Sequence, residues 1–250
     1  EHGGTSYYGI LEDGLVFRLH QQPGHMEPIP LSEAKVLPLV TPSKVVCVGL
    51  NYKAHAEELG YPLPNMPSFF LKPPSSIIGN GEPIVLPSGM GRIEHEAELA
   101  MVVGKVCRNL TPEEAEESLF GFTCANDVTA REVQKVDPLI GHCKSYDTFC
   151  PIGPWIETEL EDINDLSIRC LVNGEVRQSA NTGDMIFRPL DLLCFLSRVM
   201  TLMPGDVILT GTPPGISPIQ ADDVVQVSIE GIGTLSNPVE GPGPEEKILQ

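Results

Sequence analysis

The chain has 250 residues and a net charge of −18, because 34 acidic residues stand against only 16 basic ones. This balance argues against nucleic-acid binding, which needs a basic surface to neutralise phosphates, and against binding to anionic membranes. Apolar residues make up 41% of the chain, which suits a globular protein with a core. No apolar run approaches the roughly 20 residues of a transmembrane helix.

The seven cysteines are scattered, and none forms the C-x-x-C spacing of a zinc or redox site. We therefore expect reduced, mostly buried thiols in a cytoplasmic protein. The first residues, Glu1 to Gly4, lack both the pattern of a signal peptide and an initiator Met. What precedes Glu1 is left open.

Residues 1–42 are predicted to form a small N-terminal β unit and a linker. Ranges 6–11 and 14–20 have the composition of two strands around the turn Glu12-Asp13-Gly14. A proline-rich passage follows, from Pro23 to Pro42, and is expected to be the linker.

Residues 43–240 are predicted to form one catalytic domain, followed by a C-terminal tail at 241–250. The strands predicted for residues 43–240 outnumber the helices and do not alternate with them. This pattern predicts an α+β fold, mainly β, with a closed or rolled mixed sheet. The dipeptide Asn173-Gly174 is the strongest hairpin signal. Strands are expected at 44–50, 68–72, 84–86, 96–103, 120–126, 166–172, 175–178, 207–210, 224–229 and 233–238. The strand at 84–86 is the one strand expected within 75–93, a stretch otherwise made of turns. Helices are expected at 52–59, from Thr111 and at 190–200.

Acidic residues alternate along one predicted strand. Glu94, Glu96 and Glu98 project from the same face, where three like charges repel each other unless a cation or water separates them. Hard oxygen ligands favour Mg²⁺, Mn²⁺ or Ca²⁺ over zinc. Asp127 follows the strand 120–126 and would supply a third carboxylate. A solvated strand face and an ordinary turn aspartate are the alternatives that spacing leaves open.

Two further features carry potential chemistry. His55 and Glu58 are three residues apart on a predicted helix, so the carboxylate can orient the imidazole as a general base, although an ordinary surface pair has the same spacing. The segment from Thr210 to Gly215 is a tight turn after a strand, and its hydroxyl and N–H groups can receive a carboxylate. Turns of this composition are often turns and nothing more.

Seven segments in order resemble the fumarylacetoacetate hydrolase family, in the branch of acylpyruvate hydrolases, oxaloacetate decarboxylases and isomerase/decarboxylases of homoprotocatechuate breakdown. The resemblance runs from about Val45 to Val239. The segments are G-L-N-Y-K-A-H-A-E-E at 49–58, F-L-K-P at 70–73, H-E-A-E-L at 95–99, N-D-V-T-A-R-E-V-Q at 126–134, K-S-Y-D-T-F-C-P-I-G-P-W at 144–155, V-N-G-E-V-R-Q at 172–178 and M-P-G-D-V-I-L-T-G-T-P-P-G at 203–215.

The resemblance implies that the fold is a β-roll and that the protein is a homodimer, as is usual in the family. It also implies roles for residues that match the family's motifs. It leaves Glu94 outside the direct metal ligands. The implied metal is Mg²⁺ or Mn²⁺. The implied ligands are Glu96, Glu98 and Asp127, the implied catalytic residues are His55, Glu58 and Lys144, and the implied substrate-binding residues are Arg131, Gln134 and Thr212.

A small anionic 2-oxo acid is the substrate class that follows from this resemblance. Its 2-oxo and carboxylate oxygens would chelate the metal, which would stabilise an enolate. Acylpyruvate hydrolysis and oxaloacetate decarboxylation are the preferred reactions. The alternatives are a 2-hydroxyhepta-2,4-diene-1,7-dioate isomerase or 5-carboxymethyl-2-oxo-hex-3-ene-1,7-dioate decarboxylase and, in another class, a catalytically weak protein that binds 2-oxo acids.

Overall fold

A computed structural model describes residues 1–19, 27–137 and 139–241, and it divides the chain into two compact units, Glu1–Leu37 and Pro38–Gln250. His20, the start of the predicted linker at Pro23 and the predicted tail beyond Gly241 lie outside the described residues. The first unit holds a three-stranded sheet of β1 (Gly9–Glu12), β2 (Leu15–Arg18) and β3 (Ile29–Pro30), followed by a 3₁₀ helix at Leu31–Glu33.

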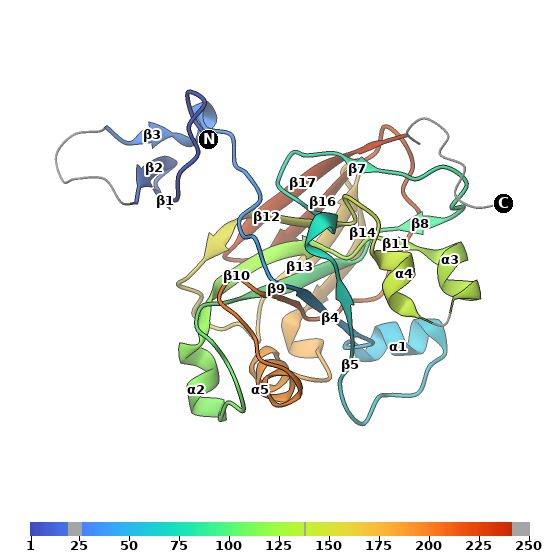
Figure 1. Ribbon diagram of the computed structural model, residues 1–250. Coiled ribbons are helices and arrows are strands. Elements are labelled where there is room, and N and C mark those ends of the chain that lie inside the picture. Colours follow the sequence, from blue (N-terminus) through green and yellow to red (C-terminus); the bar gives the residue numbers. More distant parts are fainter. Residues whose placement is uncertain (20–26, 138, 242–250) are drawn as a thin grey trace. The chain divides into compact units, whose positions relative to one another are not determined.

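A seven-stranded mixed sheet forms the centre of the second unit (Figure 1). Its middle strands are mostly apolar and almost wholly buried, as expected of strands covered on both faces. In spatial order the strands are β5 (Ser68–Lys72), β4 (Val45–Gly49), β15 (Val207–Leu209), β9 (Ala97–Val103), β10 (Leu119–Asn126), β12 (Cys150–Glu157) and β6 (Ile77–Ile78).

A five-stranded sheet packs against β9, β10 and β12, and the main apolar core fills the space between the two sheets. Its hairpin turns at Asn173 and Gly174, which have φ angles of 54° and 80°, as a two-residue hairpin loop requires. In spatial order its strands are β14 (Glu175–Asn181), β13 (Ser167–Val172), β16 (Val224–Ile229), β17 (Gly233–Glu240) and β7 (Ile84–Val85). A separate pair joins β11 (Thr129–Ala130) to β8 (Ile93–Glu94).

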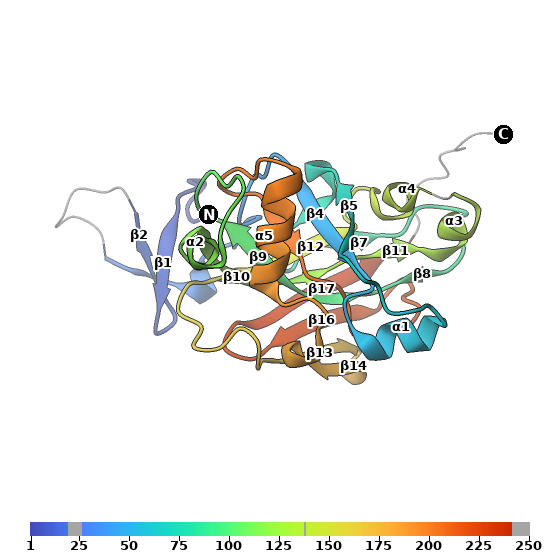
Figure 2. The ribbon, with the colours of Figure 1, turned by 90° about the horizontal axis from the view of Figure 1, so that it is seen from below.

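The helices gather at two ends of this unit (Figures 1 and 2). At one end lie α2 (Pro112–Glu117) and α5 (Pro189–Val199), and at the other lie α1 (Lys53–Leu59), α3 (Arg131–Val136) and α4 (Ile140–Lys144). Short 3₁₀ helices occur at Pro74–Ser76 and Thr182–Asp184. The predicted start of α2 is confirmed by a complete capping box between Thr111 and Glu114. None of the described helices has both the length and the apolar character needed to cross a membrane.

The predicted fold class, mainly β with a rolled mixed sheet, is confirmed. The sequence prediction missed β12, because Pro151 and Pro154 argue against a strand that is paired on both sides. The register between β10 and β12 is irregular from Phe122 to Cys124, and this bulge accommodates the stretch around Pro154. It also missed β3, within the predicted linker, and β6, β8 and β11, all of which are only two residues long.

Candidate active site

Three buried carboxylates meet where β9 begins and β10 ends. Glu96 lies just before β9, Glu98 lies within it, and Asp127 follows β10. The two strands are antiparallel neighbours with Ala97 opposite Asn126, so the sheet register itself brings these positions together. One oxygen from each of the three carboxylates lies within 4.8 Å of the other two, and all three residues are buried.

Two lysines neutralise the Asp127 side of this cluster. The Lys144 ammonium, from the end of α4, lies 2.8 Å from Glu96 Oε2 and 2.5 Å from Asp127 Oδ2. The Lys72 ammonium, at the end of β5, lies 2.5 Å from Asp127 Oδ1 and donates to the Phe149 carbonyl at 2.7 Å. Both lysines are buried, so each carries its charge inside the protein and depends on these carboxylates to hold it there.

Arg131 binds the same cluster from the start of α3. Its Nε donates to Glu94 Oε2 at 2.5 Å and its Nη2 donates to Glu96 Oε1. Its Nη1 donates to Gln134 Oε1 at 2.9 Å. Arg131 and Gln134, both predicted to face a substrate, are therefore adjacent, and the arginine holds two carboxylates of the protein.

These contacts fix the charge states of the paired groups. Burial alone would raise the pKa of Glu96, but the cations of Lys144 and Arg131 outweigh it and hold the pKa far below its ordinary value. Burial alone would lower the pKa of Lys144, but Asp127 and Glu96 raise it above its ordinary value. Glu96 is therefore a carboxylate and Lys144 an ammonium across the neutral pH range.

Glu98 differs from the other carboxylates. Among the described residues no lysine or arginine forms an ion pair with it, and its hydrogen-bond donor is the backbone N–H of Gly211, at 2.5 Å from Oε2. Burial, together with repulsion from Asp127 and Glu96, raises its pKa well above the ordinary value. Glu98 thus has an uncompensated charge of the kind that a bound cation would neutralise.

The His55–Glu58 pair forms on α1 as the helical spacing predicts. His55 Nδ1 lies 2.9 Å from Glu58 Oε2, and the imidazole is buried while the carboxylate is partly exposed. The other carboxylate oxygen of Glu58 accepts the N–H of Gly215 at 3.0 Å. Because Glu58 engages Nδ1, Nε2 is the ring nitrogen left to meet a substrate or water. His55 also lies close enough to Glu96 to contribute to the low pKa of that carboxyl.

The turn from Thr210 to Gly215 does receive carboxylates, and they are the protein's own. Its N–H groups at Gly211 and Gly215 bind Glu98 and Glu58. The hydroxyl of Thr212, the residue predicted to hold a substrate carboxylate, donates to the Ala97 carbonyl at 2.9 Å and accepts from Gln178.

Two residues of this site, Lys72 and Gln178, received no role from the sequence. A lysine at the end of the apolar run Phe69-Phe70-Leu71 signals a buried charge that needs a partner, and its position is visible in the sequence. Gln178 carries no comparable signal, because an amide in a strand is ordinary.

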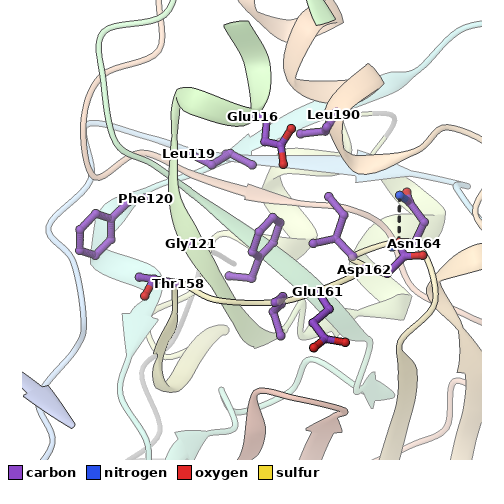
Figure 3. Close-up of a pocket in the computed structure, with 12 residues that line it drawn as sticks. Glu116, Leu119, Phe120, Gly121, Thr158, Glu161, Asp162, Asn164 and Leu190 are labelled. Atoms are coloured by element: carbon purple, nitrogen blue, oxygen red, sulfur yellow. Dashed lines mark hydrogen bonds between the residues drawn. The ribbon is translucent and has the colours of Figure 1, made fainter. Parts of the chain in front are cut away.

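A cavity of about 360 Å³ lies at the other end of β10 (Figure 3). Its lining combines apolar side chains with polar groups, and the acidic residues among them belong to α2 and to the loop after β12. It contains none of the predicted site residues. Its lining is Glu116, Leu119, Phe120, Gly121, Phe122, Thr158, Leu160, Glu161, Asp162, Ile163, Asn164 and Leu190.

Residues 44–240 match the family described as fumarylacetoacetate (FAA) hydrolase C-terminal. The human mitochondrial oxaloacetate tautomerase FAHD2A is 42% identical over 225 residues, which cover 84% of this chain and 71% of the human protein. The crystal structure of 5-carboxymethyl-2-hydroxymuconate delta-isomerase from Mycobacterium smegmatis is 44% identical, with a TM-score of 0.85 and coverage of 96% and 94% of the two chains. The maleylpyruvate hydrolase of Sphingobium sp. SYK-6, in complex with manganese(II) and pyruvate, is 31% identical, with a TM-score of 0.82 and coverage of 95% and 97%.

Proposed function

Since this chain belongs to the fumarylacetoacetate hydrolase family, whose members include hydrolases, isomerases and tautomerases, we propose that it is a Mg²⁺- or Mn²⁺-dependent enzyme acting on a small anionic 2-oxo acid. Acylpyruvate hydrolysis and oxaloacetate decarboxylation are its proposed reactions. The observation that carries the proposal is the buried cluster of Glu96, Glu98 and Asp127, in which Glu98 has no cationic partner among the described residues.

The donor set fits the proposed metal. Three carboxylates offer the hard oxygen ligands that Mg²⁺ and Mn²⁺ prefer, and the described structure groups neither a cysteine nor a histidine with them as a ligand. The Glu98 charge also gives a cation an electrostatic reason to bind here. When bound, the metal would supply Lewis-acid stabilisation of negative charge on the 2-oxo oxygen.

The side chains around the cluster would handle the proton and the charge. His55, held at Nδ1 by Glu58, can accept a proton at Nε2 from a water or from the carbon next to the 2-oxo group. Lys144 stays cationic and lies against the carboxylate cluster, where it can donate a hydrogen bond to a substrate oxygen. Water removal by the surrounding buried residues would strengthen both interactions.

Isomerisation or tautomerisation of a 2-oxo acid is the second candidate. It is favoured by the 44% identity to the Mycobacterium smegmatis isomerase and the 42% identity to the human oxaloacetate tautomerase. Tautomerisation moves a proton at the carbon beside the 2-oxo group, and isomerisation of a dienol moves one to the far end of the conjugated system. Both pass through an oxyanion at the 2-oxo position, so they need a base and a stabilised oxyanion as hydrolysis does. A protein that binds a 2-oxo acid and turns it over weakly remains the alternative of another class.

Purified protein assayed with Mg²⁺ or Mn²⁺ against acetylpyruvate, oxaloacetate in both tautomeric directions, and 2-hydroxyhepta-2,4-diene-1,7-dioate would test the proposal. We expect turnover of at least one substrate and its loss in EDTA, with recovery when metal is restored. Full activity in chelator would refute the metal role, and no activity on any of these substrates would refute the substrate class.

A matched pair of variants on α1 separates catalysis from simple binding. Glu58→Gln should lower kcat by about 10-fold or more, because the amide no longer anchors His55 as a carboxylate does. Glu57→Gln alters an exposed neighbour on the same helix and should leave kcat unchanged. Equal effects of the two substitutions would argue for the binding protein.

The assembly and compartment remain parts of the same proposal. We expect a homodimer, which light scattering after size-exclusion chromatography would detect. All seven cysteines are free and buried, which suits the reducing conditions of the cytoplasm.

A further inference from the structure

Gln178 is a buried amide in β14 whose hydrogen-bonding capacity is fully used. Its Oε1 accepts the Ala97 N–H and the His95 Nδ1–H, each at 3.0 Å. Its Nε2 donates to Thr212 Oγ1 at 2.8 Å and to the Pro213 carbonyl at 2.7 Å. Two acceptor sites and two donors are all that a side-chain amide offers, so every one of them is engaged.

The four bonds join two segments that are far apart in the sequence. Ala97 lies between the carboxylates of Glu96 and Glu98, whereas Thr212 and Pro213 form the middle of the turn after β15. The Thr212 hydroxyl closes the ring by donating to the Ala97 carbonyl at 2.9 Å. Gln178 therefore clamps the turn directly against the carboxylate-bearing strand.

Both ends of this turn hold a carboxylate of the candidate active site. Gly211 N–H donates to Glu98 and Gly215 N–H donates to Glu58. Gly215 also packs tightly on β14, since a Cβ added there would lie 2.2 Å from the Arg177 carbonyl oxygen. A shift of the turn away from β14 would therefore move the donors of two different acidic groups at once.

His95 is the remaining hydrogen-bond partner of the Gln178 side chain. Because Gln178 Oε1 is an acceptor, His95 Nδ1 must carry the hydrogen, and Nε2 faces the hydroxyl of Ser217 at 2.8 Å. The His95 ring is fully buried between these two partners. It thus supplies Gln178 with a fixed donor and fixes the direction of the amide.

We propose that Gln178 is a positioning residue of the active site: through the turn at 210–215 it sets the places of Glu98 in the metal cluster and of Glu58 beside His55. This inference rests on the proposed function, because it takes both acidic groups as functional. It predicts that a residue without contact to metal or substrate controls metal affinity and the catalytic pair together.

Three variants test the inference. Gln178→Met keeps the approximate shape and removes all four hydrogen bonds, whereas Gln178→Glu keeps both acceptors and removes the two donors to the turn. Asn237→Leu is the matched control: Asn237 is equally buried in β17, and its amide donates to two backbone carbonyls, Gly79 and Glu82, each at 2.8 Å. All three lose buried hydrogen bonds, but the control loses them at a different turn.

The readouts are Mn²⁺ titration of the chelated, metal-free protein and amide hydrogen exchange across residues 210–216. Both Gln178 variants should bind Mn²⁺ at least about 10-fold more weakly, as is usual when a residue that supports a metal ligand is lost. Their exchange across the turn should also be faster. Asn237→Leu should lower the melting temperature and leave both readouts at their wild-type values.

A Gln178 variant that melts lower but keeps wild-type Mn²⁺ affinity and wild-type exchange across the turn would overturn the inference, because its role would then be stability alone. These readouts need no substrate. Wild-type protein that binds Mn²⁺ but converts no 2-oxo acid would refute the proposed reaction. The Mn²⁺ affinity and the hydrogen exchange of the variants would still decide the role of Gln178. Wild-type protein that binds no Mn²⁺ would refute the metal site. Hydrogen exchange across residues 210–216 would then decide whether Gln178 holds the turn in place.

Discussion

At the scale of single residues, the site is a problem of charge balance. Glu94, Glu96 and Asp127 each have at least one cation within ion-pair distance, and Glu98 has none among the described residues. A buried carboxylate without a partner is costly, and a protein resolves that cost by protonating it or by binding a cation. The sequence shows the four acidic residues but cannot show which of them lacks a partner, since Lys72 and Lys144 reach the cluster only after folding.

Glu98→Gln should therefore stabilise the chelated protein at high pH. The raised pKa of Glu98 means that the folded state holds this proton more tightly than the unfolded chain, whose glutamates titrate near 4.5. Above that pH the unfolded chain releases the proton first, so the wild type loses stability as pH rises towards the pKa of the folded state. The neutral amide has no such loss.

Melting temperatures measured in chelator between pH 5 and pH 8 would show this effect. The gap between Glu98→Gln and the wild type should widen in favour of the variant as pH rises, and added Mn²⁺ should reverse the order by stabilising the wild type alone. Glu159→Gln, at an exposed position, serves as the control. Parallel curves for the variant and the wild type would contradict the expected cost of the Glu98 charge.

At the scale of elements, local signals predicted regular structure well and missed what depends on contacts. The strand at Ser68–Lys72 and the strand at Val224–Ile229 have the predicted bounds, because each is a short apolar or alternating run between clear breaks. By contrast, β12 contains two prolines, and an irregular register with β10, in which β12 carries two extra residues between Gly153 and Glu157, makes the strand possible. No local pattern announces that irregularity.

The turn at 210–215 illustrates the same limit for the site. Its glycines predicted a tight turn, and the structure gives them a reason: Gly211 and Gly215 have φ angles of 98° and 97°, and a side chain at either one would collide with a neighbouring segment. The groups that accept from its N–H donors, Glu98 of β9 and Glu58 of α1, lie far away in the sequence.

Gly215→Ala should damage both stability and catalysis. Its positive φ costs alanine about 1 kcal/mol or more, and the Cβ must also push the turn away from the Arg177 carbonyl, which draws the Gly215 N–H from Glu58. Gly205→Ala is the matched control, since Gly205 has a φ of 84° with no atom within 4 Å of the added Cβ.

Urea denaturation and steady-state kinetics would separate the two contributions. Gly205→Ala should lose stability and keep its kcat, whereas Gly215→Ala should lose more stability and also most of its kcat. Equal losses of stability and unchanged kcat in both variants would show that the contact with β14 places nothing that the reaction uses.

At the scale of the whole molecule, an acidic chain has to attract an anionic substrate. A net charge of −18 repels such a molecule at long range, so binding depends on positive charge concentrated in one place. Lys72, Lys144, Arg131 and Arg92 supply four positive charges, but four carboxylates already engage or face them. A divalent metal would turn that balance positive, which is why the proposed function needs the metal for substrate binding as well as for chemistry.

The candidate active site lies within one of the two compact units. Every residue assigned to the site, and every hydrogen-bond or ion-pair partner described for it, lies in the unit Pro38–Gln250. This unit also contains both large sheets and the main core. It therefore has the composition of a domain that folds alone.

A fragment of residues 38–250 should accordingly fold and bind Mn²⁺ with the affinity of the full chain. Circular dichroism would report its folding, and titration of the chelated fragment would report its metal affinity beside the full chain as control. A cooperative melt with unchanged affinity is the expected result, because every ligand and supporting contact described for the site lies within residues 38–250. A fragment that folds but binds Mn²⁺ at least about 10-fold more weakly, the size of effect that follows loss of a supporting residue, would mean that the unit Glu1–Leu37 contributes to the site.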